Sequence, residues 1–132
     1  MKLGQHFLVD EAIALRIAEY ADLGPDDWVL EIGPGEGSLT AALAAKADQV
    51  YAVEIDPELA AQLTGRFSNV QVVTGDALKV ELPECNKIVS NLPYQISSSL
   101  TYRLLSRPFE MAVLMYQWEF ARRLKAAPGS DE

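Results

Sequence analysis

The chain has 132 residues, which is enough for one domain with a hydrophobic core and too few for two. An apolar fraction of 49% and a mean hydropathy of +0.03 are typical of a globular protein, and no apolar run reaches the roughly 18 residues that span a bilayer. The net charge of −8 argues against nucleic-acid binding by the chain as a whole, although the excess of acidic residues lies in residues 1–94.

Strands and helices are expected to alternate along the chain. Helices are predicted at 10–20, 38–46, 58–67, 96–105 and 119–126. Strands are predicted at 28–32, 49–55, 70–74, 87–90 and 109–115. The strand sequences VLEI, AVEI and MAVLM are nearly continuously apolar, as expected of strands that are covered on both faces. This alternation predicts an α/β fold with a mostly parallel sheet and helices on both faces.

The end of the chain and its single cysteine give two smaller indications. Residues 127–132 read as a loop, which favours a piece of a longer protein over a complete small one. Cys85 cannot form an internal disulfide and favours a reducing compartment, so a cytoplasmic protein is expected. We interpret Cys85 as an incidental thiol in a polar stretch.

A glycine loop follows the first predicted strand and precedes a predicted helix. Gly33, Gly35 and Gly37 form the pattern GxGxG, whereas a dinucleotide fingerprint needs a glycine or alanine at position 38, which is Ser38. In this context glycines let the backbone approach a ligand at a helix N-terminus. The loop residue Glu36 would repel a pyrophosphate but not a zwitterion, which favours S-adenosylmethionine as the cofactor.

Acidic side chains end the next two strands. Glu54 lies 21 residues after Gly33, where a carboxylate can accept hydrogen bonds from ribose hydroxyls; its alternative role is a solvated strand end. Asp76 could bind the amino group of adenine, or it could simply be a turn residue in its Gly-Asp pair.

The sequence SNLPY closes the fourth predicted strand. The Asn91 side-chain oxygen and a main-chain carbonyl of Leu92 or Pro93 could accept both N–H bonds of an aromatic amine, and Pro93 would keep these acceptors rigid. Tyr94 offers a flat face for an extruded base, with stacking worth roughly 1–3 kcal/mol. The alternative is that Asn-x-Pro-Tyr merely turns the chain. Because ligands of doubly wound sheets bind at the carboxyl ends of the strands, we favour an amine-binding motif.

Several segments together resemble one family of enzymes. These are GQHFL at 4–8, EIGPGEGSLT at 31–40, VEID at 53–56, GDAL at 75–78, NLPY at 91–94 and QxEFAxRL at 117–124. In this order they resemble the ribosomal RNA adenine N6,N6-dimethyltransferases, the KsgA/Dim1 family, which is related to the Erm methyltransferases. NLPY and GQHFL are more particular than the glycine loop, which many methyltransferases share. Tyr116, Trp118 and Gln95 depart from the expected pattern.

The resemblance implies a role for each matching residue. His6 and Leu8 would close over the methionine end of the cofactor, and Tyr94 would stack on the target base. The residues assigned to the cofactor are His6, Leu8, Gly33, Gly35, Glu54, Asp76, Ala77 and Asn91. Those assigned to catalysis are Asn91, Leu92, Pro93 and Tyr94. No metal and no membrane partner are expected.

The resemblance also implies a fold and a function. The expected fold is the Rossmann-like class I methyltransferase fold with strand order 3-2-1-4-5, and residues 1–132 would be its S-adenosylmethionine-binding domain without the last strands and the helical C-terminal domain. The fifth strand would then be an exposed edge. The expected reaction is dimethylation of adenine N6 in a loop of small-subunit ribosomal RNA, with that RNA or the assembling small subunit as partner. Two alternatives stay open, methylation of a protein glutamine and a non-catalytic ribosome-assembly or transcription factor.

Overall fold

The computed structural model describes residues 11–92 and 97–116. Its helices are α1 (Glu11–Tyr20), α2 (Ser38–Ala44), α3 (Pro57–Leu63) and α4 (Ser97–Leu105). Its strands are β1 (Trp28–Ile32), β2 (Gln49–Glu54), β3 (Val70–Thr74), β4 (Lys87–Leu92) and β5 (Met111–Tyr116). The predicted helix at 119–126 lies outside the described residues.

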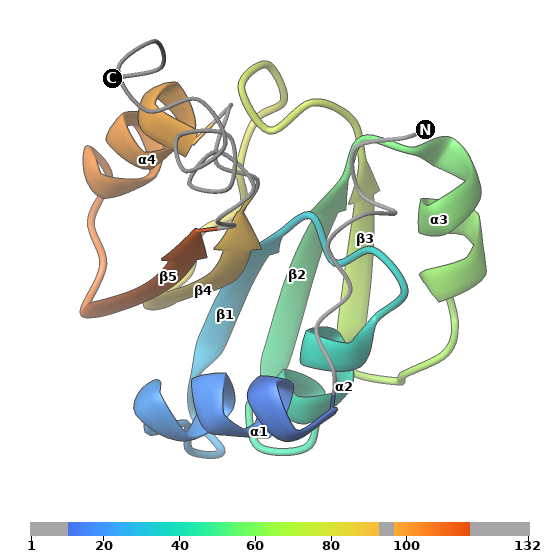
Figure 1. Ribbon diagram of the computed structural model, residues 1–132, viewed down its shortest axis with the longest axis vertical. Coiled ribbons are helices and arrows are strands. Elements are labelled where there is room, and N and C mark those ends of the chain that lie inside the picture. Colours follow the sequence, from blue (N-terminus) through green and yellow to red (C-terminus); the bar gives the residue numbers. More distant parts are fainter. Residues whose placement is uncertain (1–10, 93–96, 117–132) are drawn as a thin grey trace, which may run out of the picture.

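The five strands form one parallel sheet in the order β3-β2-β1-β4-β5 (Figure 1). This arrangement confirms the predicted strand order. All carboxyl ends therefore meet at one edge of the sheet, and chain order changes direction between β1 and β4. In a doubly wound sheet this is the switch point beside which ligands bind. Within the described residues β5 pairs only with β4, as expected for an edge strand.

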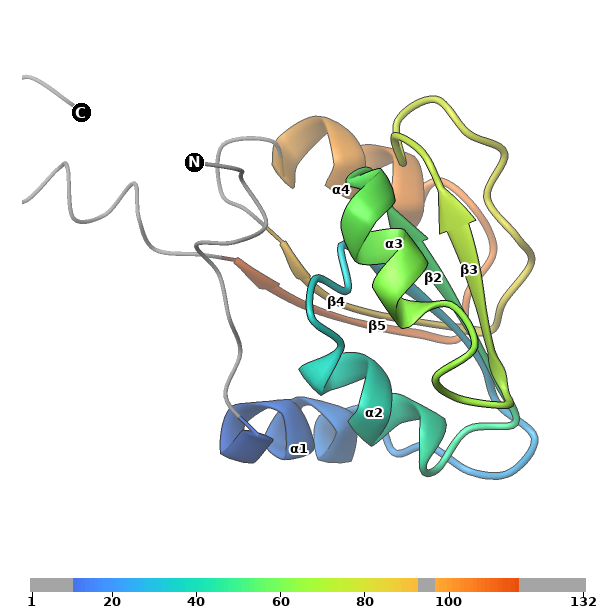
Figure 2. The ribbon, with the colours of Figure 1, turned by 90° about the vertical axis from the view of Figure 1, so that its right-hand side faces the viewer.

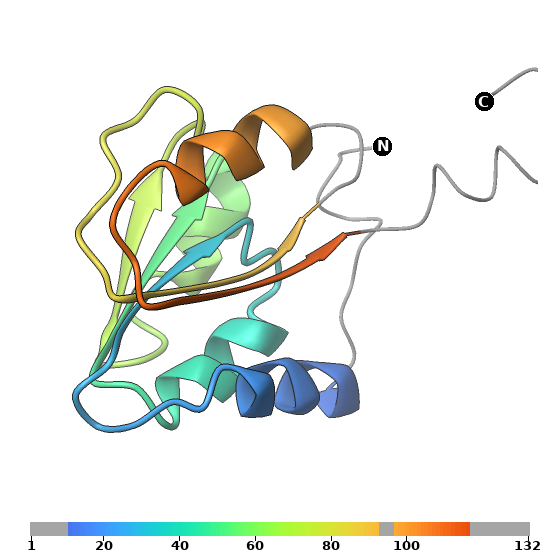
Figure 3. The ribbon, with the colours of Figure 1, turned by 90° about the vertical axis from the view of Figure 1, so that its left-hand side faces the viewer.

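Helices cover both faces of the sheet. Figures 2 and 3 show α1 and α2 on one face and α4 on the other. Ile17 of α1 and Leu43 of α2 are buried in the same cluster as Val89 of β4. On the opposite face, Leu104 of α4 is buried with Ile88 of β4. Neighbouring strand residues alternate between these two clusters, which is why the strand sequences contain so few polar residues.

Helix α3 begins as predicted but ends four residues early. The Asp56 carboxylate accepts the Glu58 N–H at 2.9 Å as an N-cap, and proline occupies the first turn. The predicted end at residue 67 is wrong, because Thr64 already has an extended backbone with ψ 126° and Gly65 has φ 85°. Glycine adopts this left-handed conformation readily, so it ends the helix here.

Strand β4 is longer than predicted and includes the first half of the NLPY motif. It runs to Leu92 instead of ending at Ser90, since Asn91 pairs with Met115 and Leu92 with Tyr116 in β5. The Asn91 and Leu92 backbones are therefore held by the sheet and do not belong to a free loop.

The amino-terminal ends of the strands are held by one buried lysine. Lys87 Nζ donates to the Ala21 and Asp22 carbonyls at the end of α1, at 2.9 and 2.7 Å, and lies 3.0 Å from Asp27 Oδ2. Burial by itself would raise the pKa of Asp27, but hydrogen bonds from Asn86 and the Gly24 N–H, together with Lys87, outweigh it and lower the pKa. This cluster links α1 to β1 and β4.

Candidate cofactor site at the carboxyl edge of the sheet

The glycine loop has the backbone that only glycine adopts without strain. Gly33, Gly35 and Gly37 all have positive φ, at 71°, 58° and 96°. The Gly33 N–H donates to the Val53 carbonyl at 2.8 Å, which fixes the loop against β2. A Cβ added to Gly33 would meet nothing within 4 Å, so the backbone at this position faces open space. The loop can therefore be approached closely by a ligand.

Glu54 connects the glycine loop to the next loop. Its side chain is buried, with 3% of the residue exposed. Oε1 accepts the Gly35 N–H at 3.0 Å and Oε2 accepts the Asp56 N–H at 2.9 Å. Each carboxylate oxygen can accept more than one hydrogen bond, so these bonds leave acceptor capacity. The ribose-binding role of Glu54 stays a prediction, and its role in fixing the two loops is additional to it.

The loop after β3 is joined to the same network. The Gly75 N–H donates to the Glu54 carbonyl at 2.8 Å. Half-buried Asp76 accepts the Leu78 N–H on Oδ1 at 2.9 Å, which is the turn geometry that the sequence left open as an alternative. The bond to Leu78 uses only Oδ1, so the second carboxylate oxygen could accept a hydrogen bond from adenine. The adenine-binding role of Asp76 stays a prediction. Ala77 is buried in the core beneath α4.

Asn91 lies beside the glycine loop. The buried Ser90 hydroxyl accepts the Ile32 N–H at 2.7 Å, and Asn91 and Gly33 are the residues that directly follow this pair. Asn91 is half-buried, whereas the Leu92 side chain is fully buried, so only the Leu92 backbone can meet a ligand. Because side chains alternate along a strand, Asn91 and Glu54 project to the face that α1 and α2 cover.

The structure brings together all of the predicted site residues that it describes. The carboxyl edge collects the glycine loop, Glu54, Asp76, Ala77, Asn91 and Leu92. The predicted roles of His6, Leu8, Pro93 and Tyr94 fall outside the described residues.

Glu31, two residues before the glycine loop, is a buried carboxylic acid that the sequence analysis did not single out. It is 1% exposed, and its Oε1 accepts the Thr40 hydroxyl at 2.6 Å. Burial raises the pKa of Glu31 to about 8; the Thr40 hydrogen bond opposes this rise and the nearby Glu54 charge adds to it. The carboxyl group of Glu31 is therefore protonated at neutral pH. The available signal was an acid within the otherwise apolar strand WVLEI.

Two exposed apolar side chains at the same edge were also missed. Ile55 follows Glu54 and is 63% exposed, and Leu78 follows Ala77 and is 41% exposed. Large apolar side chains placed beside carboxylates suit a ligand that has both a flat apolar ring and hydrogen-bonding groups. The available signal was an apolar residue close after each acidic residue at the end of a strand. Ile55 follows Glu54 directly, and Leu78 follows Asp76 by two positions.

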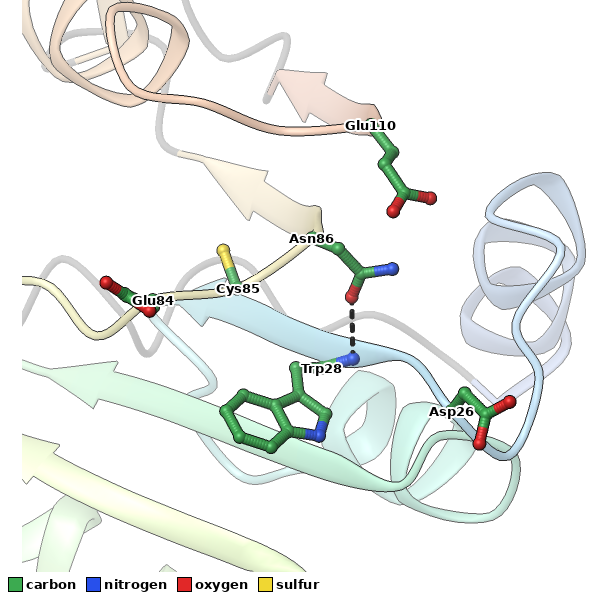
Figure 4. A pocket seen from close by; sticks show the side chains of 6 residues that line it. All are labelled: Asp26, Trp28, Glu84, Cys85, Asn86 and Glu110. Atoms are coloured by element: carbon green, nitrogen blue, oxygen red, sulfur yellow. Dashed lines mark hydrogen bonds between the residues drawn. The ribbon is translucent and has the colours of Figure 1, made fainter.

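A separate pocket lies at the opposite, amino-terminal edge of the sheet (Figure 4). It has a volume of about 330 Å³ and is lined by Asp26, Trp28, Glu84, Cys85, Asn86 and Glu110. The Asn86 Oδ1 in its wall accepts the Trp28 N–H at 2.7 Å. Burial raises the pKa of the Cys85 thiol, although the nearby Arg107 charge acts to lower it. The raised pKa keeps the thiol protonated. This supports the interpretation of Cys85 as an incidental residue.

Across residues 11–92 and 97–116, no three His, Cys, Asp or Glu side chains are grouped so as to hold a metal ion. Nor does this part of the chain contain a helix long and apolar enough to cross a membrane.

Comparison with known proteins decides the family. The family model described as "Ribosomal RNA adenine dimethylase" matches residues 1–132. The chain belongs to the ribosomal RNA adenine dimethylase family. A curated member, the "Probable ribosomal RNA small subunit methyltransferase A" of Methanothermobacter thermautotrophicus, is 60% identical over 132 residues, covering 98% of this chain and 48% of the relative. The chain thus spans about half the length of this curated dimethylase relative.

Solved structures agree with this assignment. A dimethyladenosine transferase from Plasmodium falciparum superposes with a TM-score of 0.79 at 37% identity, over 95% of this chain and 48% of that one. The 23S rRNA methyltransferase ErmE superposes with a TM-score of 0.75 at 42% identity, over 93% of this chain and 52% of that one. The predicted Rossmann-like class I methyltransferase fold is therefore confirmed for this dimethylase-family chain.

Proposed function

We propose that residues 1–132 form the S-adenosylmethionine-binding part of an enzyme that dimethylates adenine N6 in a loop of small-subunit ribosomal RNA. The observation that carries this proposal is the hydrogen bond from the Ile32 N–H to Ser90, which sets the beginning of NLPY beside the glycine loop. A cofactor loop next to an amide and main-chain acceptors is the arrangement that methyl transfer to an amine needs. Membership of the dimethylase family supports the same reaction.

The residues at the carboxyl edge fit S-adenosylmethionine. Gly33 faces open space, Glu54 has acceptor capacity for ribose hydroxyls, and Ile55 offers an apolar surface to an adenine ring. The carboxylates of Glu36 in the glycine loop and of Asp76 in the loop after β3 would repel the pyrophosphate of a dinucleotide but attract a cation. When bound, S-adenosylmethionine supplies a methyl group on a positively charged sulfur. His6 and Leu8 would close over its methionine end.

The NLPY residues would prepare the target amine. The lone pair of an adenine amino group is delocalised into the ring, so the amine is a poor nucleophile unless it is held and reshaped. The Asn91 side-chain oxygen and a carbonyl of Leu92 or Pro93 would accept its two N–H bonds and direct the lone pair toward the methyl donor. Tyr94 would stack on the extruded base. Catalysis would be mostly positioning, which contributes at most about 7–11 kcal/mol.

Binding of RNA would require charge from elsewhere in the protein. The loops of the carboxyl edge carry acidic side chains at Glu36, Glu54 and Asp76, which disfavour phosphate. Residues 95–132 are slightly basic, with Arg122, Arg123 and Lys125 as a cluster. Ribosomal RNA loops suit such an enzyme because single-stranded bases can be splayed out readily.

The experiment compares methyl transfer and cofactor binding in the full-length protein. Asn91→Ala should abolish transfer of labelled methyl groups to small-subunit ribosomal RNA, whereas calorimetry should still detect S-adenosylhomocysteine. Gln71→Ala removes an exposed amide of β3 away from the site and should leave both measurements unchanged. Sustained turnover by Asn91→Ala would contradict the acceptor role. Labelling of a protein glutamine instead of RNA would contradict the RNA substrate.

A further inference from the structure

The segment that carries Asp76 and Ala77 is a single turn with little stability of its own. The Lys79 and Val80 N–H groups both donate to the Asp76 carbonyl, at 2.8 and 2.9 Å. One isolated turn is not stable in water, because ordering its backbone outweighs so few hydrogen bonds. The Leu78 N–H orients the Asp76 carboxylate on this turn at 2.9 Å, so the direction in which the carboxylate points in the protein depends on the contacts that hold the turn itself.

Arg103 of α4 makes these contacts. Its Nη1 donates to the Ala77 carbonyl and its Nη2 donates to the Val80 carbonyl at 2.8 Å. Both hydrogen bonds are partly buried, which strengthens them relative to exposed ones. A planar guanidinium holds its donors in a fixed fork, so one side chain fixes both ends of the turn at once.

The guanidinium is itself held on a rigid element. Leu100 and Leu104 lie on either side of Arg103 in α4 and are almost completely buried. They belong to the same core cluster as Ala77, so the helix and the turn also share an apolar contact. Helix α4 follows β4 and the NLPY motif in the chain. Arg103 thus connects two parts of the site. It joins the Asp76 loop, assigned to the adenine of the cofactor, to helix α4, which follows the NLPY motif assigned to the target amine.

We propose that Arg103 is a positioning residue that aims Asp76 at the 6-amino group of the cofactor's adenine and so sets selectivity for that purine. This inference rests on the proposed function, since it takes the adenine-binding role of Asp76 from there. Arg103 acts through the turn and does not touch the cofactor itself. Losing it frees the turn, so the carboxylate no longer distinguishes an amino group from a carbonyl oxygen at that position.

The chain offers a matched control at the other end of the same loop. Arg107 Nη2 donates to the Pro83 carbonyl, beyond the turn that contains Asp76. Arg107→Met therefore removes the same guanidinium group and one contact to the same loop without releasing the turn. An effect of Arg103 that comes only from charge or from general loop stability should appear in Arg107→Met as well.

The test measures binding of two ligands to the full-length protein by calorimetry. S-adenosylhomocysteine carries the 6-amino group, and S-inosylhomocysteine carries a carbonyl oxygen instead. Wild type and Arg107→Met should prefer the first ligand by the same ratio. Arg103→Met should reduce that ratio about tenfold, which corresponds to about 1.4 kcal/mol. Arg103→Lys, which keeps the charge but not the fork, should give an intermediate ratio.

A purely structural role would weaken both ligands alike and lower the melting temperature without changing the ratio. An unchanged ratio in Arg103→Met would overturn the inference, and if that variant does not fold, an unchanged ratio in Arg103→Lys overturns it. Wild-type protein that binds neither ligand would contradict the proposed function itself. Wild-type protein that binds both equally would contradict the adenine-binding role of Asp76 and this inference with it.

Discussion

Replacing Glu31 by glutamine should remove most of the pH dependence of folding stability between about pH 5 and 8. The pKa of Glu31 is raised from 4.5 to about 8 in the folded chain. Between these values the folded chain keeps a proton that the unfolded chain has released. Stability is therefore complete below pH 4.5 and falls as pH rises, by about 1.4 kcal/mol per pH unit.

The expected difference at neutral pH is large for one residue. At pH 7 the wild type should have lost about 3 kcal/mol relative to pH 4.5, on the slope just given. Glutamine does not ionise, and its side-chain oxygen can still accept the Thr40 hydroxyl that Glu31 accepts. Glu31→Gln should thus be more stable than wild type at pH 7 and converge with it near pH 4.5.

Urea unfolding of the cofactor-free protein at several pH values, followed by circular dichroism, measures this difference. Glu81→Gln, which changes an exposed loop carboxylate, serves as the control and should follow the wild-type profile. Parallel stability profiles for wild type and Glu31→Gln from pH 5 to 8 would refute the reasoning.

Three further substitutions test contacts that hold the fold and the site. Lys87→Met leaves Asp27 without its ion pair and should destabilise the fold by roughly 3 kcal/mol in urea unfolding. Because the pKa of Asp27 is lowered from 3.8, the Asp27 carboxylate stabilises the fold above that pH. The loss of stability in Lys87→Met should therefore shrink as pH falls below 3.8. A loss of stability that does not change with pH would contradict the ion pair. Gly37→Ala forces an L side chain to φ 96° and places a methyl group 3.1 Å from a leucine side chain, so it should lower the melting temperature, while Gly24→Ala should have a smaller effect. Ser90→Ala leaves a buried N–H unpaired and should cost about 1–3 kcal/mol by urea unfolding, whereas Ser90→Thr keeps the hydroxyl and should retain more stability.

The order of the elements could be predicted because the central strands β1, β2 and β4 are covered on both faces. Nearly continuous apolar sequences such as VLEI and AVEI mark such strands, and the glycine loop and Asp56-Pro57 mark the helix starts that follow. These signals are local, so they can be seen in one stretch of sequence. The ends of the helices and strands could be predicted less accurately than their order. The pairing of Asn91 with Met115 lengthens β4 through a neighbour that is distant in sequence.

The interactions that hold the site could not be predicted in the same way. Glu31 is protonated because burial removes its carboxyl group from water, against the opposing hydrogen bond from Thr40, and Arg103 meets Ala77 across 26 positions of sequence. Sequence alone gave the residue types but not their neighbours. Glu54 illustrates the difference. It was predicted to bind ribose, and its hydrogen bonds to the backbones of two loops became visible only in the structure.

The pairing of β1 with β4 explains why the glycine loop and the beginning of the NLPY motif lie side by side. The β1–β2 ladder continues to Ile32, whereas the β1–β4 ladder ends at Leu30 and Ile88. Beyond that pair the Ser90 hydroxyl accepts the Ile32 N–H at 2.7 Å. A side-chain hydrogen bond therefore follows the last backbone pair between β1 and β4, at the place where chain order reverses. The ends of these two strands can then turn in different directions. A single serine hydroxyl joins β1 to β4 at this point, which is why Ser90→Ala should loosen the glycine loop and the beginning of the NLPY motif together.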